Sequence, residues 1–161
     1  MRNGNWDTVE TYLDQHRDAL LIKARIDSSY RIPLHIAVSA GHLHIVEKLV
    51  QLMTEKDMLI EQKDGFTVLA LSIRIGNLPI AKCLIGKNKK LLSVVHEPEG
   101  IPVSYVVYCD DFQMARYLYS ITPLEDLTLG DNAKTGASLI CACIDRQNFG
   151  KDSRNSRIDL M

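Results

Sequence analysis

Three segments of the chain repeat one pattern of apolar residues at a spacing of 34 to 35 residues. They are residues 32–50, 67–85 and 101–119. In each, a short apolar stretch is followed by a turn containing Gly or Asp and then by a second apolar stretch. Self-similarity at a fixed period of this size is typical of repeat proteins, in which each unit packs only against its neighbours. The pattern therefore predicts a solenoid.

Within one copy, the residues predict two antiparallel helices joined by a tight turn. Pro33 suits the first position of a helix, where its missing amide proton costs nothing and its ring fixes φ. Gly41 and Gly76 follow, and glycine ends a helix in the left-handed conformation without strain. Asn77 and Asp111 then stand where an N-cap side chain would open the second helix.

The second helix of each copy carries an apolar stripe at helical spacing. One helix pair cannot bury such a stripe alone, so neighbouring pairs are expected to stack and cover it. Leu49, Leu84 and Leu118 occupy the same column of the three copies, and we expect them to form a buried ladder. The predicted fold class is all-α.

One copy resembles the T-P-L-H-x-A motif of ankyrin repeats and the Gly-His pair that follows it. The matching residues are Pro33-Leu34-His35-Ile36-Ala37 and Gly41-His42. The resemblance implies an ankyrin-repeat solenoid of stacked antiparallel helix pairs with inter-repeat finger loops. It also implies a non-catalytic module that binds another protein, and it gives His35 the role of fixing a turn.

More narrowly, residues 4–144 resemble plant ankyrin-repeat proteins whose C-terminal half is a PGG-type transmembrane domain. The likeness is carried by the segments 41–47, 81–84, 89–92, 114–119 and 122–127. It implies a role in plant signalling or in stress and defence responses. No apolar run approaches the ~20 residues that a membrane span needs, so we expect that domain to be absent from this chain.

The copies divide the chain unevenly. We expect an ankyrin-repeat domain over 1–144, with a partial copy at 4–30, full copies at about 31–62, 63–97 and 98–130, and a damaged copy at 131–144. The copy at 98–130 should be the least regular, since Asp110 and Asp111 stand where glycine is preferred. The polar composition of 145–161 favours a disordered tail.

Charge and cysteine content bear on the kind of partner and on the cellular location. Nineteen basic and twenty acidic side chains leave a formal charge of −1, which argues against nucleic acid as a partner. The four cysteines show no disulfide spacing and no secretory signal opens the chain, so a cytoplasmic location is expected. A chain cut from a longer membrane protein would lie at the cytosolic face of the plasma membrane. Two alternatives therefore stay open: a cytosolic regulatory fragment of such a protein, and a truncated product without independent function.

No residue pattern points to catalysis, a metal or a cofactor. A nucleophile with a recognisable base and a glycine-rich phosphate loop are both missing from the sequence. His42 and His44 flank a helix start on different faces, which favours solvation over metal binding. Cys141 and Cys143 lack the second ligand pair of a zinc site. The basic cluster 87–90 is expected to be a solvated turn rather than a contact for nucleic acid or anionic lipid.

Ankyrin-like stacks bind partners through their finger tips and the inner face of the first helices, and this likeness selects candidate residues here. Among them, we expect Phe66, Arg74 and Tyr108 to contribute most to partner binding, because aromatic and arginine side chains dominate interface hot spots. The alternative is that all are ordinary surface residues. The complete set of candidate protein-binding residues is Ser28, Ser29, Arg31, Ser39, Ala40, Lys63, Asp64, Phe66, Arg74, Ile75 and Tyr108.

Overall fold

The computed structural model describes residues 29–96, 100–109 and 111–128. Within these ranges every regular element is helical, and the one β-bridge pairs His96 with Gly100. The elements are α2 (Pro33–Ser39), α3 (Leu43–Leu52), η2 (Asp57–Leu59), α4 (Val68–Arg74), α5 (Leu78–Lys87), η3 (Lys89–Ser93), α6 (Pro102–Tyr105), η4 (Val106–Cys109), α7 (Phe112–Ile121) and α8 (Leu124–Thr128). The predicted all-α solenoid is confirmed. The partial copy before residue 29, the copy at 131–144 and the tail lie outside the described residues, as do Cys141 and Cys143.

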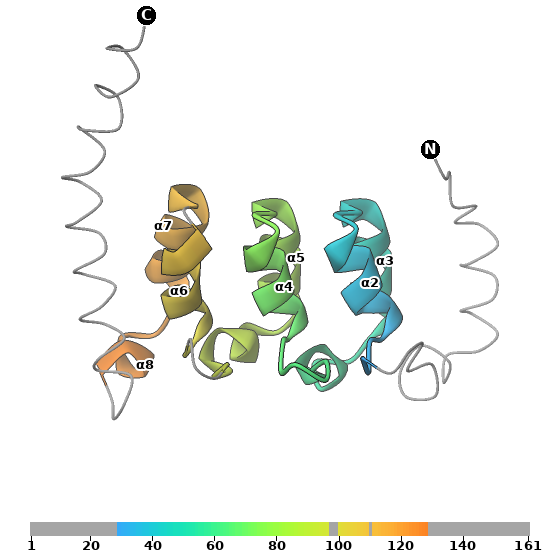
Figure 1. The fold of residues 1–161 in the computed structure, drawn as a ribbon, viewed down its shortest axis with the longest axis horizontal. Coiled ribbons are helices and arrows are strands. Elements are labelled where there is room, and N and C mark those ends of the chain that lie inside the picture. Colours follow the sequence, from blue (N-terminus) through green and yellow to red (C-terminus); the bar gives the residue numbers. More distant parts are fainter. Residues whose placement is uncertain (1–28, 97–99, 110, 129–161) are drawn as a thin grey trace, which may run out of the picture.

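Helix pairs stack side by side along the chain (Figure 1). The first helices form one row, in which α4 packs between α2 and α6. The second helices form a second row, in which α5 packs against α3. Within each copy the two helices also pack against each other, α2 against α3 and α4 against α5. This arrangement buries each apolar stripe against the next copy, as the repeat pattern predicts.

The turns within the copies have the predicted chemistry. Gly41 and Gly76 adopt φ values of 71° and 66°, the left-handed region that glycine enters without strain. The Asn77 side chain accepts a hydrogen bond from the Ile80 amide at 3.1 Å and so caps α5. Asp111 caps α7 in the same way, accepting from the Met114 amide at 3.0 Å. Local sequence alone is therefore enough to end one helix and start the next.

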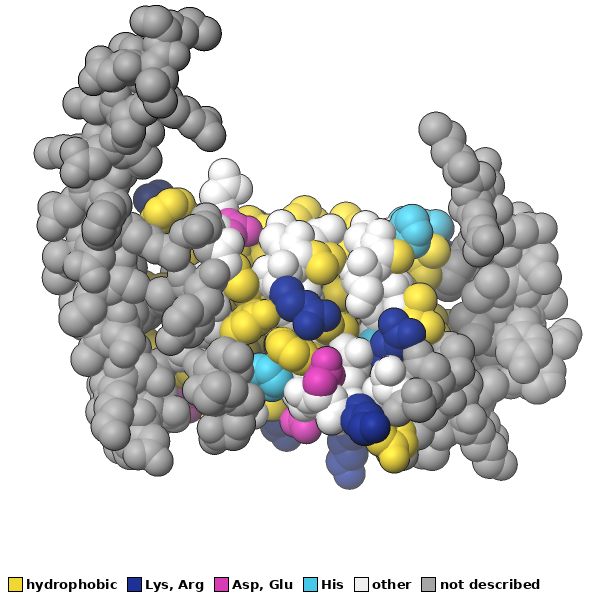
Figure 2. Space-filling view, viewed as in Figure 1, with side chains coloured by type: hydrophobic (Ala, Val, Ile, Leu, Met, Phe, Trp, Pro, Cys, Tyr) yellow, Lys and Arg dark blue, Asp and Glu magenta, His cyan; other side chains and the backbone are white. Residues whose placement is uncertain are grey.

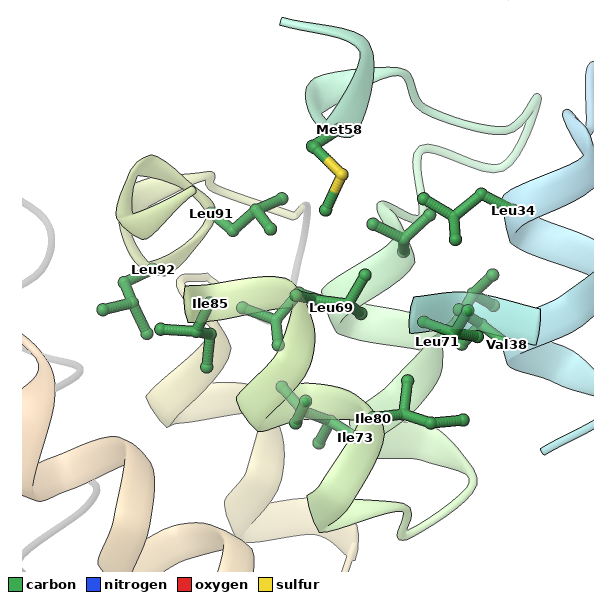
Figure 3. Packing of buried hydrophobic residues seen from close by; sticks show 14 of the residues in the cluster. Leu34, Val38, Met58, Leu69, Leu71, Ile73, Ile80, Ile85, Leu91 and Leu92 are labelled. Atoms are coloured by element: carbon green, nitrogen blue, oxygen red, sulfur yellow. The ribbon is translucent and has the colours of Figure 1, made fainter. Parts of the chain in front are cut away.

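The core runs continuously through the stack. The predicted ladder is buried, with Leu49, Leu84 and Leu118 at 2%, 0% and 0% exposure. Figure 3 shows how side chains of the first helices meet those of α5. Side chains of the two 3-10 helices η2 and η3, such as Met58 and Leu91, cover the end of this core near the finger loops. The residues labelled there are Leu34, Val38, Met58, Leu69, Leu71, Ile73, Ile80, Ile85, Leu91 and Leu92.

His35 fixes the start of α2, as the ankyrin likeness implies. Its Nδ1 accepts a hydrogen bond from the Ile32 amide at 3.2 Å, and the side chain is fully buried. Burial lowers the pKa of His35 from 6.5 to about 4, because desolvation disfavours the charged ring. The nearby carbonyls of Ile60 and Phe66 oppose this shift only in part. The ring is therefore neutral at physiological pH.

The third copy is the least regular, as expected. Its first helix, α6, has four residues and continues as the 3-10 helix η4, whereas α2 and α4 each have seven. Asp110 itself lies outside the described residues.

The basic cluster at 87–90 requires one correction. Lys89 and Lys90 are exposed, but Asn88 between α5 and η3 is buried, with 2% exposure. Its Nδ2 donates to the Glu55 carbonyl at 2.7 Å, and its Oδ1 accepts from the Lys90 amide at 2.9 Å. The prediction of a wholly solvated turn is wrong for Asn88, because this side chain links the loops of two successive copies.

Candidate functional site

The candidate residues come from two kinds of segment, the finger loops and the ends of the first helices. In the loops, Lys63 and Asp64 are exposed, and the Lys63 amide donates to the Ser29 carbonyl at 3.0 Å, which ties one finger to the next. Arg31 is half-buried. Ser28 lies outside the described residues.

The helix-end candidates occupy matching positions in successive copies. Ser39 and Ala40 are exposed at the end of α2, and Arg74 and Ile75 are exposed at the end of α4. Tyr108 lies in η4, but its side chain is not described. The face over α2, α4 and α6 carries basic, hydrophobic and histidine side chains next to one another (Figure 2).

Arg74 and Phe66 are brought into direct contact. The guanidinium carbon of Arg74 lies 4.6 Å from the centroid of the Phe66 ring, a cation–π arrangement. Phe66 precedes α4 and Arg74 is its last residue, so the two span the first helix of one copy. The stacked ring limits the freedom of an otherwise exposed arginine. A preordered arginine loses less entropy when it binds a partner.

Two further aromatic residues complete what we call the finger cluster, defined as Phe66, Arg74, His96 and Tyr105. The rings of Phe66 and His96 lie 4.0 Å apart between centroids, with an interplanar angle of 43°. The Tyr105 ring meets Phe66 edge-on at 6.0 Å. The cluster therefore joins the second finger loop, α4, the third finger loop and α6. Because Phe66 also packs against the core, it supports the stack as well as the surface.

His96 and Tyr105 were not among the sequence candidates. The bridge between His96 and Gly100 holds His96 in place through hydrogen bonds of 2.9 and 2.7 Å. Gly65 has a φ of 80°, the left-handed region that glycine enters without strain, and a Cβ added there would lie 3.4 Å from His96 Nδ1. One sequence signal could have found His96: aligned copies place it in the finger position of Gln62. Adjacent fingers stack, so this position lies next to the finger that carries Phe66.

The finger cluster offers a guanidinium group and aromatic rings, which contact other molecules through charge and stacking. Among the described residues, no three His, Cys, Asp or Glu side chains gather to hold a metal. Burial raises the pKa of the Cys83 thiol, which opposes a nucleophilic role. None of the described helices is long and apolar enough to cross a membrane.

Comparison with known families identifies the repeats. The family model described as ankyrin repeats (3 copies) matches residues 1–94, more than half of the chain. No curated protein matches the sequence. The described helices α6 and α7 continue the stack beyond the matched residues. Ankyrin repeats are in general non-catalytic modules that bind other proteins. The chain belongs to the ankyrin-repeat family.

Proposed function

We propose that this chain recognises its protein partner through the finger loops and the ends of the first helices, with Arg74 at the centre. The observation that carries this proposal is the exposed Arg74 held over the Phe66 ring at 4.6 Å. Arginine and aromatic residues are enriched at interface hot spots, and rigid anchors bind with a smaller entropic cost.

Neighbouring residues extend this surface along the stack. Ser39, Ala40 and Ile75 are exposed at corresponding turns of two successive copies. Lys63 and Asp64 are exposed in the finger that precedes α4. Ser29 and Arg31 continue the fingers toward the first copy, and the η4 position of Tyr108 continues the helix-end row. These side chains differ from copy to copy because the stack does not depend on them.

The narrower proposal is that the partner belongs to a plant signalling, stress or defence response at the cytosolic face of a membrane. Its support is the likeness of segments such as 41–47 and 114–119 to plant ankyrin-repeat proteins.

The test compares proteins that are captured from a plant extract by three purified forms of the chain. These are the wild type, Arg74→Ala, and the control Gln51→Ala on the exposed side of α3. We expect at least one protein to be retained by the wild type and the control and lost with Arg74→Ala, while all three melt at the same temperature. Identical captured sets for all three would overturn the role of Arg74, and partners without any signalling role would overturn the narrower proposal.

A further inference from the structure

A second surface lies on the other row of helices. An open groove of about 520 Å³ runs between α5 and α7, with Leu78 and Lys82 on one side and Phe112, Arg116 and Tyr117 on the other. Because α5 and α7 approach each other less closely than α3 and α5 do, the groove opens at the third copy. None of its residues belongs to the finger cluster or to the candidate binding surface.

The charged side chains that line this groove, Lys82 and Arg116, are both cationic. The acid next to it in sequence is Asp111, whose carboxylate accepts hydrogen bonds from the Gln113 and Met114 amides as the N-cap of α7. Helices α5 and α7 contain Lys82, Lys87 and Arg116 but no Asp or Glu, although the chain as a whole has a formal charge of −1. Helix α3, by contrast, carries both Glu47 and Lys48. A groove lined by one sign of charge attracts the opposite charge and raises the rate of encounter with a charged partner.

Apolar surface lies next to the two cationic side chains. Leu78 stands one helical turn before Lys82 on α5, and Phe112 stands one turn before Arg116 on α7. Phe112 is 62% exposed, and Leu78 is half-buried on the opposite wall. The Lys82 ammonium lies 5.1 Å from the centroid of the Tyr117 ring, a cation–π contact that joins the two walls of the groove. The groove can therefore hold an apolar side chain against Leu78 and Phe112 while acids of the same segment meet the adjacent Lys82 and Arg116.

We infer that this groove binds an acidic peptide segment of a partner protein, one that inserts a leucine or phenylalanine side chain between α5 and α7. A peptide fits better than an anionic membrane, because the apolar groups Leu78 and Phe112 stand on the two facing walls of a groove rather than on one flat face. The site is independent of the surface centred on Arg74, and it would give the stack two partners or two contacts with one.

The probe is an acetylated peptide with a Leu-Phe pair flanked on each side by three glutamates, titrated into the full chain by calorimetry. Two control peptides replace the glutamates by glutamine or the Leu-Phe pair by Ser-Ser. The groove variant is Lys82→Glu/Arg116→Glu, and Lys89→Glu/Lys90→Glu makes the same change of net charge outside the groove. Vesicles of phosphatidylcholine with phosphatidylserine test the membrane alternative.

We expect saturable binding of the acidic Leu-Phe peptide that falls by at least about tenfold in the groove variant and changes little in the Lys89/Lys90 control. Both control peptides should bind more weakly than the probe, and added salt should weaken binding of the probe. Phe112→Ser should also weaken binding without lowering the melting temperature. No saturable binding up to about 100 µM peptide would overturn the inference. So would equal losses in both charge variants, or vesicle binding that depends on Lys82 and Arg116 while peptide binding does not.

Discussion

The change Leu84→Ala tests whether stacking supplies the stability of this chain. Leu84 has no exposed surface and lies in α5, which packs against α3, α4 and η3. The substitution removes three carbons, and at about 0.8 kcal/mol per buried carbon the lost transfer free energy is about 2.4 kcal/mol. The cavity left behind adds to this, so the free energy of unfolding should fall by about 2–5 kcal/mol. That is a large share of the roughly 5–15 kcal/mol of a typical domain.

Urea unfolding followed by far-ultraviolet circular dichroism measures this change. With a slope of about 1–3 kcal/mol per molar urea, the midpoint should decrease by roughly 1 M or more. The control is Leu124→Ala, the same substitution at a residue that is 71% exposed, which should shift stability by less than about 0.5 kcal/mol. If Leu84→Ala and Leu124→Ala unfolded at the same urea concentration as the wild type, the reasoning from stacked burial would be refuted.

Three other variants test particular contacts, each by the free energy of unfolding. The pKa of His35 is about 4 in the folded chain and 6.5 in the unfolded chain, so between these pH values the unfolded chain binds one proton more. The free energy of unfolding should therefore fall by up to about 3 kcal/mol as the pH drops from 6.5 to 4. His35→Gln should flatten this fall above pH 5, where few carboxylates titrate, whereas His42→Gln should not; equal slopes in both variants would contradict the assignment. Asn88→Ala should cost about 1–3 kcal/mol, because it leaves the Glu55 carbonyl without its donor, and a cost near zero would show that this link is unimportant. Gly86→Ala should instead stabilise by about 0.5–1 kcal/mol, since the added Cβ on α5 meets nothing within 4 Å; a loss of stability would contradict this.

The parts of the fold that could be predicted from sequence are those that local chemistry decides. The φ values of Gly41 and Gly76 and the caps at Asn77 and Asp111 depend on a few adjacent residues, which the repeat places in register. The burial of Leu84 follows from its column, because equivalent positions in a stack have equivalent surroundings.

What could not be predicted depends on contacts between copies. The burial of Asn88 depends on Glu55, 33 residues earlier, whereas the adjacent lysines suggested a solvated turn. The position of His96 beside Phe66 likewise needs the fingers of two copies in place. The groove at Lys82 and Tyr117 arises from the wider spacing of α5 and α7, which no property of either helix alone reveals.

The stacking order itself can be measured directly through nuclear Overhauser effects between methyl groups in the folded chain. Helix α4 packs against both α2 and α6, so methyls of α4 such as Leu69 should show cross-peaks to α2 methyls such as Leu34 and to α6 methyls such as Val103. Cross-peaks between α2 and α6 should be absent. Direct contacts between Leu34 and Val103, or no contacts from α4 to either neighbour, would contradict a stack of successive helix pairs.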